Sequence, residues 1–444
     1  MLSSHRDFSV AQTRIEPVNA RWEIDRVLRS CWIEKRPVYL QLPSDVPAMS
    51  IEVPEEPLQL AAPTSDPTQL VLAIERIATR MAEADLPAIL LDADVARFGL
   101  TKPIVRLIEA HSIPFATLSA AKALIDESHE LHLGTYRGAA SPPEVRVAIE
   151  TADCLLCVGV RFTDTATGFF SHRLRSEALI NIRAFDVTVG TTHVPGVAGS
   201  EVLSALVKAI HVKPRRTLPP RLQPPTRLPS QFRQSLTQDR FWQRMQDFIR
   251  PGDVVLADIG TSSAGTAGLR MPNGVAVIGQ PLWAAVGYSL PALLGTLLAA
   301  PRRRQLLFIG DGAFQMTAQE LSTILRRALK PIIFLINNNG YTIERLILGS
   351  GSSYNDINQW RYADAASFFD TQGQAIAYRV RTEDELEDAL EAARDREALV
   401  LIELVMSRLD APGPLVNFAQ RCAEFNFPRL ATSAVSLLRT RSNT

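Results

Sequence analysis

The stretch GDGAFQMTAQELSTILRRALKPIIFLINNNGYTIE, residues 310–344, carries the strongest structural signal in the chain. The apolar run 305–309 leads into Asp311, and a second apolar run, 331–336, leads into Asn338. The residues between the two runs are numerous enough for one helix, which neighbouring parallel strands require as a crossover. Both polar loops are therefore predicted at the carboxyl edge of one sheet, where open α/β sheets bind ligands.

The two loops together offer ligands for a hard cation. The carboxylate of Asp311, the side-chain amide of Asn338 and one backbone carbonyl form a set that suits Mg²⁺ bound to phosphate groups. The helix expected after Gly312 directs its free N–H groups at the same place, which favours an anion. A GDG triplet alone is usually only a tight turn, so the second loop carries the inference. The spacing predicts a magnesium–diphosphate site.

The surrounding sequence predicts an α/β protein. Apolar runs alternate with amphipathic stretches on both sides of a proline-rich segment, and this alternation indicates Rossmann-like parallel sheets in a central and a C-terminal domain. Proline suits extended linkers and fits poorly inside helices or sheets. The predicted domains are 1–50, 65–212 and 235–420, with linkers at 51–64 and 213–234.

The expected elements follow from the same patterns. The first predicted domain, 1–50, has the pattern of one helix and one strand, which cannot bury both faces of a sheet, so we expect it to be the remnant of a third α/β domain. Elsewhere strands are predicted at 87–92, 113–118, 153–160, 253–258, 275–279, 305–310, 331–337 and 398–405. Helices are predicted at 67–84, 142–152, 240–249, 318–329 and 382–396, the last opened by a capping box.

Composition and segment patterns exclude several classes of protein. Lys+Arg and Asp+Glu both number 47, which is not the basic footprint of a nucleic-acid binder. The uncharged run 282–300 is interrupted by glycine and proline, so we expect a buried helix and not a membrane span. Cys154 and Cys157 lie in a predicted strand and not in a metal site.

Trp242 and Trp283 lie on helical patterns and are expected in the core. Without a secretory signal, the expected location is cytoplasmic.

Several segments resemble one family. The stretches GDGAFQMTAQELSTILR, NNNGYTIERLI, YNDINQW, GQPLWAAVGYSLPALLG, ADIGTS and LGTYRGAAS are similar to those of thiamine diphosphate-dependent 2-oxo acid decarboxylases of the pyruvate, indolepyruvate and phenylpyruvate group. The resemblance runs in order along nearly the whole chain, up to about residue 415. It implies a carboxy-lyase that converts a 2-oxo acid into an aldehyde and CO₂ with thiamine diphosphate and Mg²⁺, the cofactor accepting the electrons that the departing carboxylate leaves.

The resemblance also implies roles for individual residues. Asp311, Asn338 and the carbonyl of Gly340 would bind Mg²⁺. Glu344 would face the substrate carboxylate and assist proton steps after CO₂ leaves, and Ile343 and Ile347 would line the substrate pocket. The implied cofactor-binding residues are Gly260, Thr261, Ser262, Ala284, Val286, Gly312, Ala313, Asn338, Gly340, Tyr341, Thr342 and Ile343. Among these, Val286 would support the bent thiamine and the Ala284 carbonyl would hold its aminopyrimidine.

The chain departs from the family pattern in two ways. Family members carry an N-terminal domain with a glutamate that protonates the aminopyrimidine, and we expect most of that domain to be missing here. We therefore expect weak cofactor binding and poor turnover by the chain alone. Ala264 and Ile259 make the substrate end larger and more apolar than is common in the family, which favours an aromatic or branched-chain 2-oxo acid.

Other readings stay open. A truncated, catalytically incompetent paralogue would bind only cofactor or associate with intact subunits. A carboligase would share the diphosphate site but carry flavin-binding signals, and a nucleotide-binding module would carry G-x-G-x-x-G, which this chain lacks. The expected partners are a small 2-oxo acid and further copies of the chain in a homodimer or homotetramer, without nucleic acid or membrane.

Overall fold

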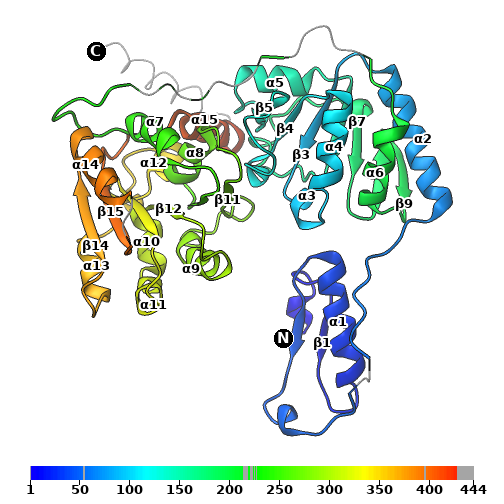
Figure 1. Ribbon diagram of the computed structural model, residues 1–444, viewed down its shortest axis with the longest axis horizontal. Coiled ribbons are helices and arrows are strands. Elements are labelled where there is room, and N and C mark those ends of the chain that lie inside the picture. The colour runs from blue at the N-terminus through cyan, green and yellow to red at the C-terminus, as the bar shows by residue number, and fades with distance from the viewer. Residues whose placement is uncertain are drawn as a thin grey trace.

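In the part of the chain that the structure describes, three separate β-sheets follow one another, with two, seven and six strands. The structure, a computed structural model, describes residues 2–53, 56–213, 219–220, 224, 226, 228–394 and 397–427. Much of the second proline-rich linker and the tail beyond residue 427 therefore lie outside the described residues. Figure 1 shows the two larger sheets side by side, each flanked by helices, while the two-stranded unit lies apart at the end of an extended segment. Among the described helices, none has both the length and the apolar character needed to cross a bilayer.

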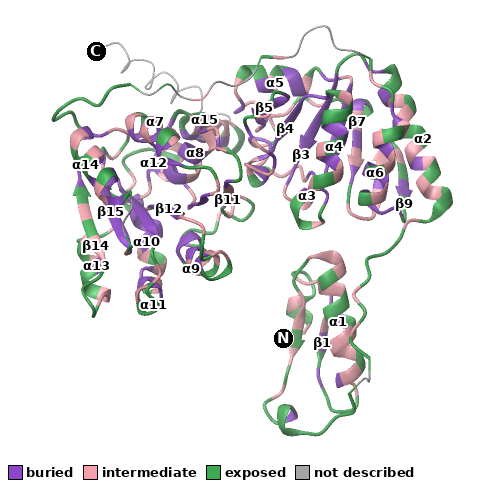
Figure 2. Ribbon diagram, viewed as in Figure 1, coloured by how far each residue is buried: buried purple, intermediate pink, exposed green. Residues whose placement is uncertain are grey.

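The N-terminal unit is small and poorly buried. Its two strands are parallel, and its core consists of Ile15, Ala20 and Val46. Figure 2 shows that most of its residues are exposed or half-buried, in contrast to the strands of the larger sheets. The predicted helix and strand are confirmed, and a further strand precedes them. The elements are β1 (Gln12–Arg14), α1 (Ala20–Glu34) and β2 (Tyr39–Gln41).

The seven-stranded sheet has the order β5-β4-β3-β6-β7-β8-β9. The first five strands in this order are parallel, and β8 and β9 add an antiparallel edge. Its strands are β3 (Pro87–Leu91), β4 (Phe115–Thr117), β5 (His132–Thr135), β6 (Cys154–Val158), β7 (Leu179–Ile182), β8 (Asp186–Val189) and β9 (Thr192–Pro195). The accompanying helices are α2 (Pro67–Glu83), α3 (Asp94–Arg97), α4 (Thr101–His111), α5 (Pro143–Glu150) and α6 (Gly199–Ala209).

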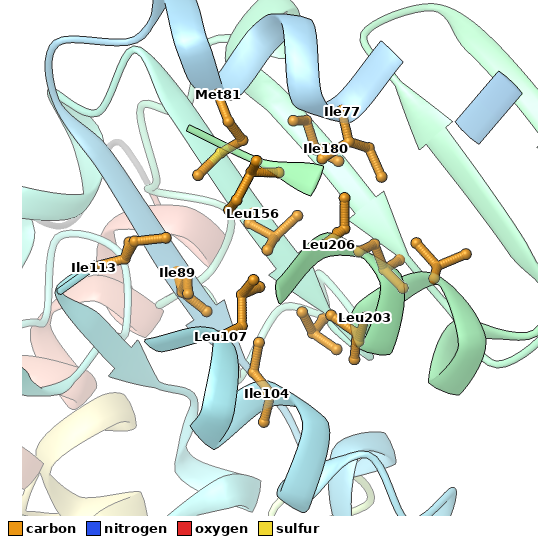
Figure 3. Packing of buried hydrophobic residues seen from close by; sticks show 14 of the residues in the cluster. Ile77, Met81, Ile89, Ile104, Leu107, Ile113, Leu156, Ile180, Leu203 and Leu206 are labelled. Carbon is orange, nitrogen blue, oxygen red and sulfur yellow. The ribbon is translucent and has the colours of Figure 1, made fainter. Parts of the chain in front are cut away.

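Both faces of this sheet are covered, as its uninterrupted apolar strands require. Helices α2, α4 and α6 bury one face, and Figure 3 shows their side chains against those of the central strands. Helix α5 covers the opposite face. Figure 3 labels ten residues of the core between this sheet and α2, α4 and α6. They are Ile77 and Met81 of α2, Ile104 and Leu107 of α4, Leu203 and Leu206 of α6, Ile89, Leu156 and Ile180 of the strands, and Ile113.

The six-stranded sheet has the order β11-β10-β12-β13-β15-β14, and all its strands are parallel. Its strands are β10 (Val254–Ala257), β11 (Ala276–Ile278), β12 (Gln305–Gly310), β13 (Ile332–Asn337), β14 (Ile376–Val380) and β15 (Val400–Val405). Its helices are α7 (Gln238–Phe248), α8 (Thr261–Gly268), α9 (Ser289–Ala299), α10 (Asp311–Thr317), α11 (Glu320–Arg326), α12 (Thr342–Leu348), α13 (Asp364–Phe369), α14 (Glu383–Ala393) and α15 (Gly413–Asn426).

Alternate residues of each central strand enter opposite cores of this sheet. In β13, Phe334 packs with α7 and α14, and Leu335 packs with α9, α10 and α11. Phe308 of β12 lies directly opposite Phe334 with ring centroids 5.1 Å apart and the rings nearly parallel. These cross-strand contacts fix the register of the two strands whose ends carry the polar loops.

Three sequence-based expectations about local structure were wrong. The crossover from β12 to β13 holds two short helices, α10 and α11, where one helix over 318–329 was expected. The run 282–300 was expected to be one helix, but it is helical only from Ser289. The residues before Ser289 form a turn-rich loop. Trp283 lies in that loop and is 78% exposed, so it is not a core residue, whereas Trp242 is buried as expected.

Candidate functional site

The loops after β12 and β13 meet at Asp311. The strands pair in parallel with Gly310 opposite Ile336, which brings both carboxyl ends to the same edge. The carboxylate of Asp311 is 1% exposed and accepts the backbone N–H of Gly340 on Oδ2 at 2.9 Å. Its Oδ1 accepts the N–H of Gly312, also at 2.9 Å. The sequence-predicted juxtaposition of the two loops is therefore present in the fold.

The Asp311 carboxylate is poorly compensated by positive charge. Burial raises its pKa to about 6, although the N–H groups of Gly340 and Gly312 act in the opposite direction. A buried carboxylate with a raised pKa gains stability when a cation binds beside it. Carboxylate and carbonyl oxygens at this edge are the ligands that Mg²⁺ prefers. The residues present therefore fit a divalent cation.

Arg345 holds the second loop from behind. Its side chain is fully buried and donates to the backbone oxygens of Asn338 and Asn355, at 3.3 and 3.1 Å. It also donates to the Asn339 carbonyl, and it forms an ion pair with Asp356 at 2.8 Å. Sequence reasoning did not identify Arg345 as part of the site. In the sequence, the position of Arg345 in the helix directly after the Asn338 loop could have indicated this role.

The conformation of the second loop requires glycine at position 340. Gly340 has φ +116°, and a Cβ there would lie 2.3 Å from the Asn355 carbonyl oxygen. Asn338 is buried, and its side chain makes no hydrogen bond with any other described residue. The Gly340 carbonyl accepts the N–H of Thr342 at 3.1 Å. The Asn338 amide is therefore available to a ligand.

The end of β10 contributes a third loop to the same sheet edge. Gly260 has φ +103° and precedes α8, whose first residues are Thr261 and Ser262. The Ser262 hydroxyl is buried and has no hydrogen-bond partner among the described residues. Thr261 and Ser262 do not line the adjacent cavity, whereas Ser263 does, together with Ile259, Gly260 and Ala264. Ser263 was not among the predicted site residues.

Asp258 anchors the loop that leads into α9. It is buried and accepts the hydroxyl of Ser289 at 2.6 Å, the N–H of Ser289 at 3.0 Å and the N–H of Gly287 at 3.2 Å. This anchoring role was also missed from the sequence. Like Asp311, Asp258 directly follows a buried strand, and that position was the available signal.

The anchored loop carries Ala284 and Val286. Ala284 adopts φ +51° and lines the cavity, while Val286 is 41% exposed. The loop packs on α10 because the Gly287 carbonyl accepts the hydroxyl of Thr317 at 2.9 Å. A Cβ at Gly287 would lie 2.8 Å from Met316 Cβ, so the contact requires glycine. The loop is thereby fixed beside Gly312 and Ala313, which open α10.

Helix α12 follows the Asn338 loop and lies at the same edge. The Tyr341 ring packs on Gly312, since a Cβ there would lie 2.4 Å from Tyr341 Cε1. Thr342 donates its hydroxyl to the Arg408 carbonyl at 2.9 Å, which attaches the helix to the segment after β15. Glu344 is half-buried and makes no hydrogen bond with any other described residue. Ile343 lines the cavity, and Ile347 is half-buried on the same helix.

Comparisons with known proteins agree with this geometry. Residues 258–404 match the model described as "Thiamine pyrophosphate enzyme, C-terminal TPP binding domain", and residues 74–206 match "Thiamine pyrophosphate enzyme, central domain". An alpha-keto-acid decarboxylase of Mycolicibacterium paratuberculosis is 41% identical over 428 residues, which are 96% of this chain and 76% of that protein. One from Mycobacterium ulcerans is 40% identical over 418 residues, 93% of this chain and 73% of that protein.

A solved structure has the same fold. The crystal structure of benzoylformate decarboxylase from Polynucleobacter necessarius superposes with a TM-score of 0.73 and 16% sequence identity. The match covers 93% of this chain and 78% of that one. At this identity the likeness concerns the arrangement of the sheets and helices.

Proposed function

Because the chain belongs to the thiamine diphosphate-dependent 2-oxo acid decarboxylase family, we propose that it releases CO₂ from an aromatic or branched-chain 2-oxo acid, using Mg²⁺ as well. The observation that carries the proposal is the 2.9 Å hydrogen bond from Gly340 to Asp311, which joins two loops at one sheet edge. Bound thiamine diphosphate supplies the electron sink for decarboxylation. Binding, orientation and proton movement fall to residues of this chain.

The diphosphate end would be held at the ends of β10, β12 and β13. Asp311 and Asn338 would bind Mg²⁺ through their side chains, and Gly340 would bind it through its carbonyl. The backbone N–H groups of the first turns of α8 and α10 would face the diphosphate. The free N–H groups belong to Thr261, Ser262 and Ala313, whereas the N–H of Gly312 donates to Asp311 and Gly312 would line the diphosphate only by its position. Gly260 provides the turn before α8.

The ring end of thiamine diphosphate would lie against the loop before α9 and the start of α12. The exposed side chain of Val286 offers an apolar support, and the Ala284 carbonyl offers an acceptor for an amino group. Tyr341, Thr342 and Ile343 would form the adjoining wall. Because Asp258 and Thr317 fix the loop, its residues would meet the cofactor with little rearrangement.

Glu344 is the side chain proposed to move protons. It lies in the first turn of α12, half-buried and without a hydrogen bond to another described residue, so its carboxyl group is available to a substrate. Beside an apolar wall, such a group would deliver a proton at the carbon that has lost CO₂. Ile343 and Ile347 would supply that wall.

The proposed substrate class follows from the lining of the cavity. The cavity measures about 520 Å³, and Ile259, Ala264 and Ile343 contribute apolar surface to it. In an apolar pocket, each additional methylene group of a substrate raises kcat/KM by about 10- to 200-fold. We test the proposal by comparing kcat/KM for phenylpyruvate, 4-methyl-2-oxopentanoate and pyruvate, with aldehyde formation as the readout. Preference for pyruvate would refute the substrate class, and cofactor binding without any CO₂ release would support the incompetent paralogue.

Association with further copies of the chain is part of the proposal. Apolar side chains near the site are exposed, among them Trp283 at 78% and Met316 at 59%. We infer that these side chains are covered by another copy of the chain, which would remove their apolar surface from water. Light scattering of the purified chain tests this, and a monomer at all concentrations would contradict it.

A further inference from the structure

A cavity of about 520 Å³ lies between the seven-stranded and six-stranded sheets. Its two walls are joined by buried polar contacts. Lys122 donates to the Leu269 carbonyl at 2.7 Å, and the N–H of Met271 donates to Glu127 at 2.7 Å. These contacts hold the cavity open in a defined shape.

The cavity lies at the topological switch point of the seven-stranded sheet. From β3 the chain continues to β4 and β5 on one side, and then places β6 and β7 on the other. Asp92 directly follows β3, Arg161 follows β6, and both line the cavity. Crevices at such points, outside the carboxyl ends of parallel strands, are where open α/β sheets bind ligands.

The charged groups of the cavity leave a positive charge unpaired. Asp94 accepts two hydrogen bonds from Arg161, at 3.0 and 2.7 Å, and also pairs with Arg97. Lys122 is paired with Glu127 at 3.1 Å. Asp92 accepts two backbone N–H groups, at 2.7 and 3.1 Å. The remaining charged residue of the lining is Arg137.

Arg137 has no partner for its guanidinium group among the described residues. Its backbone is fixed, because its N–H donates to Ser141 Oγ at 2.7 Å and the preceding Tyr136 is fully buried. Burial lowers the pKa of Arg137 to about 10, so the group remains charged at neutral pH. Arg137 is half-buried beside the cavity, so an anion that reaches its unpaired guanidinium group offsets the cost of this partial desolvation.

We propose that this cavity is a binding site for a small anion that carries a carboxylate or phosphate group, held by the guanidinium fork of Arg137. A guanidinium group binds either of these planar or tetrahedral anions through two parallel N–H donors. The same cavity is lined by Gly260 and Ile343, so the bound anion lies next to the candidate cofactor site. Two sources supply this chemistry: the 2-oxo acid substrate itself, or a phosphorylated metabolite.

Calorimetric titration of the full chain, without thiamine diphosphate or Mg²⁺, tests the proposal. One arm uses inorganic phosphate and the other uses phenylpyruvate, at constant ionic strength. We expect at least one anion to bind, with affinity reduced about tenfold or more in Arg137→Gln and less in Arg137→Lys, which keeps the charge but lacks the fork. Binding of phenylpyruvate alone identifies the substrate as the source, and binding of phosphate alone identifies a phosphorylated metabolite.

The matched control is Arg173→Gln, since Arg173 is exposed and is not part of the cavity lining. It should leave both affinities unchanged. Thermal unfolding should show that Arg137→Gln is about as stable as the natural chain, because its guanidinium group has no hydrogen-bond or ion-pair partner among the described residues to lose. The proposal is overturned if neither anion binds, or if Arg137→Gln binds them as tightly as the natural chain. Because cofactor is absent from these titrations, the outcome is independent of whether the chain decarboxylates 2-oxo acids.

Discussion

The backbone N–H of Gly340 lies 2.9 Å from Oδ2 of Asp311, and this single hydrogen bond joins loops that follow two different strands. It depends on a left-handed backbone at Gly340 and on space beside its Cα, since a Cβ would lie 2.3 Å from the Asn355 carbonyl oxygen. Asp311 therefore receives its second hydrogen bond only when position 340 is glycine.

Replacement of Gly340 by alanine should disrupt this junction. We expect the free energy of unfolding to fall by about 2–3 kcal/mol, because alanine is strained at this φ and clashes with the backbone. The stabilisation by thiamine diphosphate and Mg²⁺ in thermal unfolding should also be lost. Gly351→Ala is the matched control, since nothing lies within 4 Å of a Cβ there. Equal stability of the two variants would contradict the role given to Gly340.

Removal of the Arg345 side chain should loosen the Asn338 loop. In Arg345→Met, buried carbonyl oxygens lose charge-assisted donors, and we expect a loss of roughly 2–4 kcal/mol in chemical denaturation. Arg361→Met serves as control, because that side chain is 89% exposed in its ion pair with Asp364. The control should change stability by less than about 0.5 kcal/mol. A change of similar size in both variants would show that Arg345 does not support the loop.

Substitution of Glu344 should separate catalysis from binding. Because this side chain makes no hydrogen bond with another described residue, Glu344→Gln should leave the unfolding midpoint and cofactor affinity unchanged. We expect kcat to fall by about 10²-fold or more, since a positioned proton donor contributes on this scale. Steady-state kinetics with saturating cofactor provide the measurement. A kcat close to that of the natural chain would exclude Glu344 as the proton donor.

The ion pair between Glu383 and Arg240 predicts a pH-dependent stability. The hydrogen bond from Arg240, at 2.7 Å, lowers the pKa of Glu383 below its ordinary value of 4.5. The pair therefore stabilises the fold above pH 4.5, and this contribution is lost as pH falls through the lowered pKa.

Glu383→Gln should accordingly lower stability by about 1.5–3 kcal/mol at pH 7, and the difference from the natural chain should shrink at acidic pH. Denaturation curves across the pH range provide the test. Glu397→Gln is the control, because the Glu397 side chain is 83% exposed in its ion pair with Lys330. A stability difference for Glu383→Gln that is constant with pH would contradict the assignment.

The buried parallel strands were predictable because both of their faces are apolar. Strands β12 and β13 were expected within a residue or two of their observed bounds, and the helix at 382–396 was located by its capping box. The edge strands β8 and β9 were missed because they are short and mix polar with apolar residues. Trp283 was misplaced because a helical pattern of apolar residues does not distinguish a helix from an apolar loop.

The candidate site was predictable only where its residues follow the strands directly. Asp311 and Asn338 have that position, so the sequence placed their loops at one edge. The contribution of Arg345 depends on carbonyl groups of a neighbouring loop, and that of Arg137 depends on a cavity between two sheets. Such relations arise from tertiary packing, and no local spacing in the sequence encodes them.

We propose that Asp311 couples Mg²⁺ to the diphosphate of the cofactor. Titration of thiamine diphosphate into the natural chain and into Asp311→Asn, each with and without Mg²⁺, measures this coupling directly. We expect Mg²⁺ to raise the affinity of the natural chain about tenfold or more and to have little effect on the variant, which lacks the carboxylate ligand. An equal effect of Mg²⁺ on both proteins would show that Asp311 does not couple the ion to the diphosphate.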